Sequence, residues 1–96
     1  MKPSAALSAH RDAVRRIVEA HRARNPRVFG SAARGEDRDD SDLDLLIDAA
    51  PGMTLFDIGA IRAELVDLLG VSVDIVTESS LRPRARQRIL AEARTV

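Results

Sequence analysis

The sequence predicts a single α/β (α+β) domain over residues 1–96, in which a small mixed sheet is covered by helices on one side. Apolar residues recur at helical spacing in three segments and alternate with polar residues in the segments between them. The length suits one domain of about 100 residues, and the content of 45% hydrophobic and 31% charged residues is typical of a folded globular protein. The expected order is helix, strand, strand, helix, strand, helix.

The first helix is predicted over residues 5–23, with Ser4 as its N-cap. Residues 25–26, Asn-Pro, end this helix, because the residue before a proline is driven out of the α region. A very short strand over residues 27–29 follows, and the small residues at 30–35 then predict a turn. The helix is inferred from one apolar stripe, formed by Leu7, Val14, Ile17 and Val18.

The second strand is predicted over residues 43–48, where apolar and acidic side chains alternate between the two faces. A turn at Pro51-Gly52 leads to a helix that begins after Thr54, because Asp57 three residues later completes a variant of the capping box. Gly70 fits the left-handed residue that ends such a helix. Its apolar stripe is formed by Phe56, Ile61, Leu65 and Leu68.

Residues 71–76 alternate again and predict the third strand. The last helix is expected to be capped by Ser79 or Ser80, with Pro83 in its first turn, where proline is tolerated. Its apolar residues are Ala85, Ile89, Leu90 and Ala93.

The composition excludes several classes of protein and site. The absence of cysteine excludes disulfides, thiolate zinc sites and cysteine nucleophiles. No apolar run approaches the roughly 18 residues of a membrane span, and the N-terminus lacks the apolar stretch of a signal peptide. We therefore expect a cytoplasmic protein with no membrane partner.

The net charge of zero conceals a separation of charge along the chain. Residues 1–34 carry a net charge of +6, residues 35–81 carry −10, and residues 82–96 carry +4. If the acidic groups converge in space, they bind protons or cations; if they lie along a solvated loop, they have no such role.

The acidic residues with the clearest chemical pattern are Asp42, Asp44 and Asp74. Two aspartates at positions i and i+2 of a strand project from the same face, and an aspartate on a neighbouring strand can complete a cluster. Oxygen donors without histidine or cysteine favour Mg²⁺ or Mn²⁺ over zinc. Such clusters commonly hold two metal ions for displacement at an α-phosphate.

Each of these features has a simpler interpretation when it stands alone. The pair Gly30-Ser31 occurs in many turns, and the acidic stretch 36–48 is typical of a solvated loop. An aspartate in a strand, such as Asp74, often lies at an edge or caps a neighbouring group. The three features occur in a fixed order: a Gly-Ser turn, then the paired aspartates, then a third aspartate. The turn offers a backbone that phosphate can approach closely, with N–H and hydroxyl groups as hydrogen-bond donors. The combination therefore favours a site for phosphate and metal.

This combination resembles a known family. Residues 30–35 (GSAARG) and 41–45 (SDLDL) are similar to the GS-x-x-RG-x5-SD-x-DL signature of the DNA polymerase β superfamily of nucleotidyltransferases. The short length and the match over about residues 10–94 point to its minimal nucleotidyltransferase (MNT) group. The resemblance implies a nucleotidyltransferase fold, two Mg²⁺ ions on Asp42, Asp44 and Asp74, and a role for Asp74 in deprotonating the attacking hydroxyl.

The resemblance also implies that Gly30 and Ser31 hold the triphosphate of ATP, and that Arg34 either contacts phosphate or braces the turn. MNT proteins are typically encoded beside a HEPN-domain toxin and act as its antitoxin, in several cases by transferring AMP from ATP to a tyrosine of the toxin. The resemblance thus implies a toxin–antitoxin function with a HEPN-type partner.

Three functions follow for this chain. The first is an Mg²⁺-dependent nucleotidyltransferase that adenylylates a hydroxyl of a partner protein. The second is a non-catalytic antitoxin or binding module that neutralises its partner by contact alone. The third is a nucleic-acid binder that uses the run of Arg82, Arg84, Arg86 and Arg88. It ranks last, because a spacing of two does not place four residues on one helical face and no aromatic side chains are present on which bases could stack. The sequence leaves the nucleotide, the acceptor and any oligomerisation open.

Overall fold

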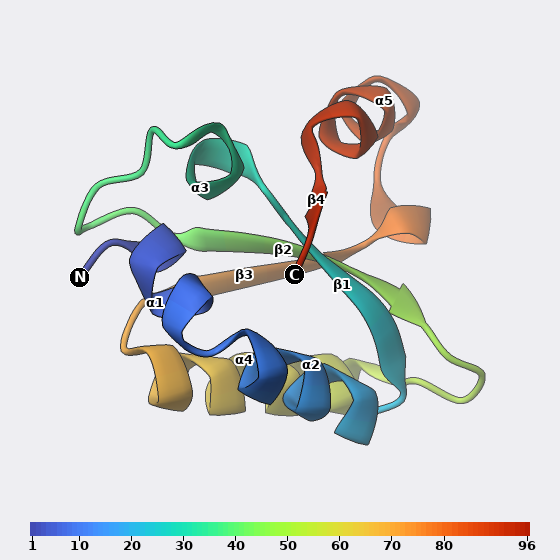
Figure 1. The fold of residues 1–96 in the computed structure, drawn as a ribbon. Helices are drawn as coiled ribbons and strands as arrows, with labels where there is room; N and C mark the ends of the chain where they lie inside the picture. The colour runs from blue at the N-terminus through green and yellow to red at the C-terminus, as the bar shows by residue number, and fades with distance from the viewer.

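A computed structural model describes residues 1–96, and in it four strands form one mixed sheet in the order β3-β2-β1-β4 (Figure 1). Strand β1 (Ala23–Phe29) is antiparallel to both β2 (Leu43–Ala49) and β4 (Arg94–Thr95). Strand β2 is parallel to β3 (Val73–Thr77). The predicted mixed sheet is confirmed. Strand β4 was not predicted, because two residues are too few to show an alternating pattern.

The helices lie on both faces of this sheet, and not on one face as expected. Helix α2 (Arg11–Ala20), which follows α1 (Pro3–Ala9), lies with α4 (Leu55–Leu69) on one face, whereas α3 (Gly30–Arg34) and α5 (Pro83–Glu92) lie on the other (Figure 1). A short 3₁₀ helix, η1 (Glu78–Ser80), joins β3 to α5. No helix in the structure has the length and apolar character needed to cross a membrane.

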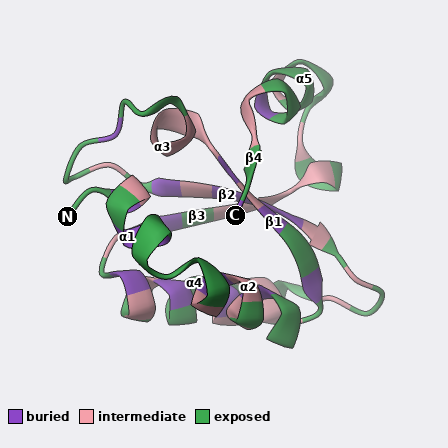
Figure 2. Cartoon of the chain, viewed as in Figure 1, coloured by how far each residue is buried: buried purple, intermediate pink, exposed green.

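The main hydrophobic core lies between the sheet and the pair α2 and α4 (Figure 2). The alternation predicted for β2 explains it, because Leu43, Leu45 and Ile47 share the face that packs against these helices. Leu46 points to the other face and is nevertheless 0% exposed, and Ile89 of α5 is buried outside the main core cluster. The second face is therefore shielded in its middle, while acidic residues lie at its ends.

The prediction of one helix over residues 5–23 is wrong, because the chain breaks at His10 into α1 and α2. The N–H of His10 bonds back to the Leu7 carbonyl, which closes the first helix. The Asn-Pro pair also lies inside β1 instead of preceding it. Asn25 has a φ of 53°, and the pairing of β1 with β2 shifts between Arg24 and Arg27, so a bulge admits Pro26 despite its missing N–H.

Helix α4 forms as the sequence predicts. The N–H of Thr54 donates to the Asp57 carboxylate at 2.9 Å, and Gly70 ends the helix with a φ of 68°. Phe56, however, does not belong to the buried stripe, since it is 91% exposed.

Two other local predictions are wrong. The segment predicted as a turn over residues 30–35 is the helix α3, which Gly35 ends in the left-handed conformation. Ser79 and Ser80 lie in η1, and Arg82 occupies the N-cap of α5.

Ser4 is not the N-cap of the first helix, because Lys2 holds that position and Asp37 supplies the acceptor. The Asp37 carboxylate accepts the Ser4 N–H at 2.8 Å and the Ser4 hydroxyl at 3.0 Å, and it is only 4% exposed. Burial raises the pKa of Asp37, but the two hydrogen bonds from Ser4, the backbone N–H of Asp37 itself and the charge of Lys2 together outweigh burial and hold the pKa below its usual value. Asp37 thus fastens the loop before β2 to the N-terminal helix.

We expect Asp37→Ala to lower the free energy of unfolding at pH 7 by about 1 to 3 kcal/mol, because two donors lose their buried acceptor. The folded-state pKa is depressed, so this contribution is present above the unfolded pKa and is lost as the pH falls through the folded value. Urea unfolding of wild type and variant from pH 7 downward measures it. Asp39→Ala, at an exposed carboxylate of the same loop, is the control and should leave stability unchanged.

Candidate active site

Asp44 and Asp74 lie side by side on the face of the sheet that carries α3 and α5. They are register partners on the parallel strands β2 and β3, so their side chains project from the same face. The N–H of Leu43 bonds to the Ser72 carbonyl at 2.8 Å and joins the two strands where they begin. Asp44 and Asp74, which are 30 positions apart in the sequence, thereby become neighbouring carboxylates.

Asp42 directly precedes β2 and is exposed. In addition to burial, the negative charges of Asp74 and Asp42 both raise the pKa of Asp44. The three carboxylates do not form a closed ligand set, since no group of three or more His, Cys, Asp or Glu side chains in the structure is arranged to hold a metal ion.

Asp44 is the half-buried member of this group. Burial, followed by the charges of Asp74 and Asp42, raises the pKa of Asp44 above its usual value, and Arg34 opposes the shift. A divalent cation near these oxygens would remove the repulsion, and an all-oxygen donor set is the kind that Mg²⁺ takes. The donor atoms of Asp42, Asp44 and Asp74 therefore have the chemistry that a divalent cation takes, although the three carboxylates do not surround one point in this structure.

Gly30 brings the backbone of the Gly-Ser segment against Asp44. It follows β1 at the point where Phe29 pairs with Asp44, and it has a φ of 73°. A Cβ built on Gly30 would lie 2.2 Å from Oδ2 of Asp44, a distance that no side chain tolerates. Only glycine allows both the left-handed backbone and this close approach.

Ser31 and Arg34 lie on α3 beside this approach. Ser31 is partly exposed at the start of the helix. The Arg34 guanidinium is engaged by two carboxylates, with Nε 3.1 Å from Glu36 and one terminal nitrogen 3.0 Å from Glu92. These ion pairs give Arg34 the geometry of a brace for the segment 30–35.

Glu92 is the residue that the sequence analysis missed. Its carboxylate, on the last turn of α5, accepts the Gly30 N–H at 2.9 Å in addition to pairing with Arg34. The one signal for it in the sequence is that it is the single acidic residue in the basic segment 82–96.

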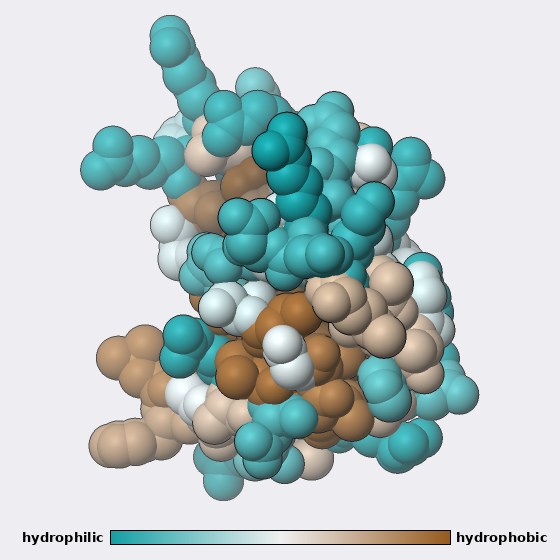
Figure 3. Space-filling view, turned by 90° about the vertical axis from the view of Figure 1, so that its left-hand side faces the viewer, coloured by the Kyte–Doolittle hydropathy of each residue, from teal (hydrophilic) through white to brown (hydrophobic).

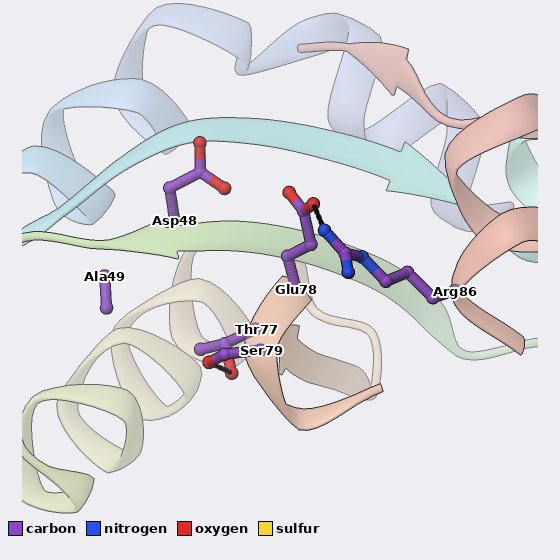
Figure 4. Close-up of a pocket in the computed structure, with 6 residues that line it drawn as sticks. All are labelled: Asp48, Ala49, Thr77, Glu78, Ser79 and Arg86. Atoms are coloured by element: carbon purple, nitrogen blue, oxygen red, sulfur yellow. Dashed lines mark hydrogen bonds and ion pairs between the residues drawn. The ribbon is translucent and has the colours of Figure 1, made fainter. Parts of the chain in front are cut away.

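The pocket of about 390 Å³ shown in Figure 4 lies away from these residues, at the far ends of β2 and β3. There Arg86 points toward Glu78 and bonds to it at 2.6 Å, and Arg27 pairs with Asp48 at 2.5 Å. The acids of this pocket are thus balanced by arginines. Asp44 and Asp74 form no ion pair with an arginine, so the aspartates, and not this pocket, are the candidate site.

The surface over α3 and α5 is largely polar on the side that Figure 3 shows. Seen from the side on which the N-terminus lies in Figure 1, hydrophilic side chains gather over the upper half of the molecule, around α3 and α5 (Figure 3). Apolar side chains gather over the lower half. The site face therefore suits a charged substrate that comes from solution.

Known proteins are similar to this chain in sequence and in fold. The model of the nucleotidyltransferase domain family matches residues 7–96. The protein adenylyltransferase MntA of Thermococcus cleftensis is 37% identical over 86 residues, which cover 90% of this chain and 84% of that protein. A solved structure assigned as a minimal nucleotidyltransferase is 50% identical, with a TM-score of 0.85 over 94% of this chain and 92% of that one.

A more distant likeness concerns the fold alone. A chain in a crystal structure of a toxin–antitoxin with AMP-PNP superposes with a TM-score of 0.75 at 19% identity, covering 88% of this chain and 69% of that chain. The match of the family model over nearly the whole chain, and the identity to these relatives, establish the family. The chain belongs to the nucleotidyltransferase domain family and is a minimal nucleotidyltransferase of the DNA polymerase β superfamily.

Proposed function

We propose that this nucleotidyltransferase transfers AMP from ATP to a hydroxyl of a partner protein. The observation that carries the proposal is the register of Asp44 and Asp74 next to Gly30, which assembles paired carboxylates and a close backbone approach at one point of the sheet. The identity to a protein adenylyltransferase supports the choice of a protein acceptor, and the AMP-PNP in the distant structure supports the choice of ATP.

In the proposed reaction the hydroxyl oxygen of the acceptor attacks the α-phosphorus of ATP. The bond from the α-phosphorus to its bridging oxygen breaks, and pyrophosphate leaves. The hydroxyl proton passes to the carboxylate of Asp74, which is exposed and can return it to solvent. Ser31 supplies hydroxyl and N–H donors to the distal phosphates, and Gly30 allows them to approach the backbone closely.

Asp42, Asp44 and Asp74 would hold Mg²⁺, or Mn²⁺ in its place, and the cations would supply charge neutralisation at the phosphates. The raised pKa of Asp44 supports this, because a group under such repulsion gains most from a bound cation.

We propose a HEPN-type toxin as the partner and an antitoxin role for this chain, in line with the toxin–antitoxin structure that shares the fold. The second candidate is neutralisation by contact alone. The largely polar surface over α3 and α5 is compatible with both.

Incubation of the chain with its partner and ATP labelled at the α-phosphate tests the proposal. We expect label on the partner, together with release of pyrophosphate. A partner that is neutralised and carries no label would establish the contact mechanism instead.

We expect ATP to bind weakly in the presence of chelator and more tightly when Mg²⁺ or Mn²⁺ is added, because the carboxylates repel the triphosphate. Mg²⁺ should also release protons in mildly acidic buffer, since Asp44 retains its proton above its usual pKa and a cation displaces it. Calorimetry in two buffers of different ionisation enthalpy measures both effects. Equal affinity for ATP with chelator and with Mg²⁺ would contradict metal binding by the aspartates.

A further inference from the structure

Glu92 joins α5 to the Gly-Ser segment. One carboxylate oxygen accepts the backbone N–H of Gly30 at 2.9 Å, and the other accepts a guanidinium N–H of Arg34 at 3.0 Å. The two partners lie 62 and 58 positions earlier in the chain, at the two ends of α3. Glu92 therefore bonds to both ends of the helix that follows β1.

Gly30 is held between two carboxylates. Its N–H is bound by Glu92, while its Cα faces Asp44 so closely that a Cβ would lie 2.2 Å from Oδ2. A displacement of Gly30 relative to α5 has to break the bond to Glu92 or move Glu92 with it. The bond thus couples the position of the Gly-Ser backbone beside Asp44 to the position of α5.

This contact is a charge-assisted hydrogen bond. The Gly30 N–H, and after it the Arg34 guanidinium, hold the pKa of Glu92 below its usual value, although burial acts in the opposite direction. Glu92 is consequently ionised at neutral pH. Arg34 balances its charge beside the place proposed for the triphosphate.

Helix α5 is followed at Arg94 by β4, which pairs with β1, and the helix makes few contacts of its own with the rest of the fold. Ile89 is its single buried residue, and the pair of Arg86 with Glu78 is largely exposed. In Figure 1 the C-terminal end of α5 is the end nearer to α3. The Glu92 contact is therefore the polar attachment between α5 and the Gly-Ser segment.

We propose that Glu92 is a positioning residue for nucleotide binding: it holds Gly30 and α5 in place so that the Gly-Ser segment can receive the triphosphate beside Asp44. This inference rests on the proposed function. Glu92 leaves the N–H and hydroxyl of Ser31 to contact phosphate, while it engages the N–H of Gly30 itself.

The first test needs no nucleotide. In ¹⁵N-labelled protein, the Gly30 amide shift should titrate with a midpoint below the usual glutamate range, because its acceptor is the ionised Glu92. Glu92→Gln should abolish this titration. Glu36→Gln is the matched control and should preserve it, since Glu36 pairs with Arg34 and makes no bond to Gly30. A Gly30 amide that is unaffected by Glu92→Gln overturns the inference.

The second test measures ATP affinity in Mg²⁺. Glu92→Ala should weaken binding by about tenfold, the effect of losing one charge-assisted hydrogen bond. Glu92→Gln should fall between that variant and wild type, because its amide oxygen still accepts the Gly30 N–H. Glu36→Gln should remain within about twofold of wild type, since its ion pair is exposed.

The outcomes of the second test separate the two proposals. Unchanged or tighter binding by Glu92→Ala overturns the inference and leaves the proposed function standing, because the carboxylate would then be irrelevant to phosphate or compete with it. A wild type that does not bind ATP overturns the proposed function and the role of Glu92 in it. The Gly30 amide then still reports whether Glu92 holds the segment.

Discussion

Replacing Asp44 by asparagine is expected to slow AMP transfer by a factor of about 10² to 10⁴, because the proposed ligand for the cation and its negative charge are lost. Asp74→Asn should have an effect of the same order, because it removes the group proposed to take the hydroxyl proton. The measurement is the rate at which label from the α-phosphate of ATP appears on the partner. Binding of the partner should persist in both variants, since neither aspartate anchors the fold.

Asp48→Asn is the matched control for Asp44→Asn. Asp48 lies four residues further along β2 on the same face, and it pairs with Arg27 at 2.5 Å. We expect its transfer rate to remain within about threefold of wild type, because a partly exposed ion pair contributes little. Wild-type transfer by Asp44→Asn would place the chemistry elsewhere. Variants that still neutralise the partner without transfer would support the contact mechanism.

Asp44→Asn should also be at least as stable as wild type in the absence of divalent cations. The raised pKa of Asp44 means that its ionised form opposes folding. Stability is therefore highest below the unfolded pKa and decreases as the pH rises through the folded value. Asparagine removes this penalty at neutral pH, and added Mg²⁺ should reduce the difference by stabilising wild type. Thermal unfolding with and without Mg²⁺ measures both effects.

Gly30→Ala is expected to lower both activity and stability, and Gly35→Ala is its matched control. Both glycines have a φ of 73°, so alanine is strained at either position by roughly 1 to 2 kcal/mol. The Cβ at position 35 meets no atom within 4 Å, whereas at position 30 it meets Oδ2 of Asp44 at 2.2 Å. Gly30→Ala must therefore also displace Asp44 or the Gly-Ser segment.

We expect Gly30→Ala to reduce transfer by about 10²-fold, the order of effect that a displacement of 1 Å produces at a reacting centre. Gly35→Ala should transfer at close to the wild-type rate. A double-mutant cycle isolates the collision, because in the Asp44→Ala background Gly30→Ala should cost no more stability than Gly35→Ala does in the wild type. Equal losses for the two glycine variants in the wild-type background would show that Asp44 moves aside freely.

The parts of the fold that were predicted correctly depend on neighbours in the sequence. Helix α4 begins and ends where Thr54, Asp57 and Gly70 make contacts within one turn of the helix. Leu43, Leu45 and Ile47 face the main core because successive side chains of a strand alternate. The Gly-Ser and SDLDL motifs belong to the same class of local signal, and their order along the chain sufficed to identify the family.

The errors occur where distant residues decide local structure. The bulge at Asn25 and Pro26 exists because β1 pairs with β2, and nothing within residues 23–29 indicates that pairing. Ser4 resembles a helix cap, but its hydroxyl is taken by Asp37, 33 residues away. The exposure of Phe56 has a local cause instead, because Phe56 lies five residues before Ile61 and therefore about 140° around the helix from the buried stripe.

The sequence by itself determined the family and placed Asp44 on the face of β2 opposite Leu43, Leu45 and Ile47, because spacing along one strand fixes which side chains share a face. Tertiary structure alone decided that Asp74 stands in register with Asp44 and that Glu92 reaches the Gly30 amide. Strand register and helix position result from packing over the whole core. The contact of Asp44 with Asp74 spans 30 positions, and that of Gly30 with Glu92 spans 62 positions. Contacts this far apart in the chain therefore produce no periodic pattern in the sequence.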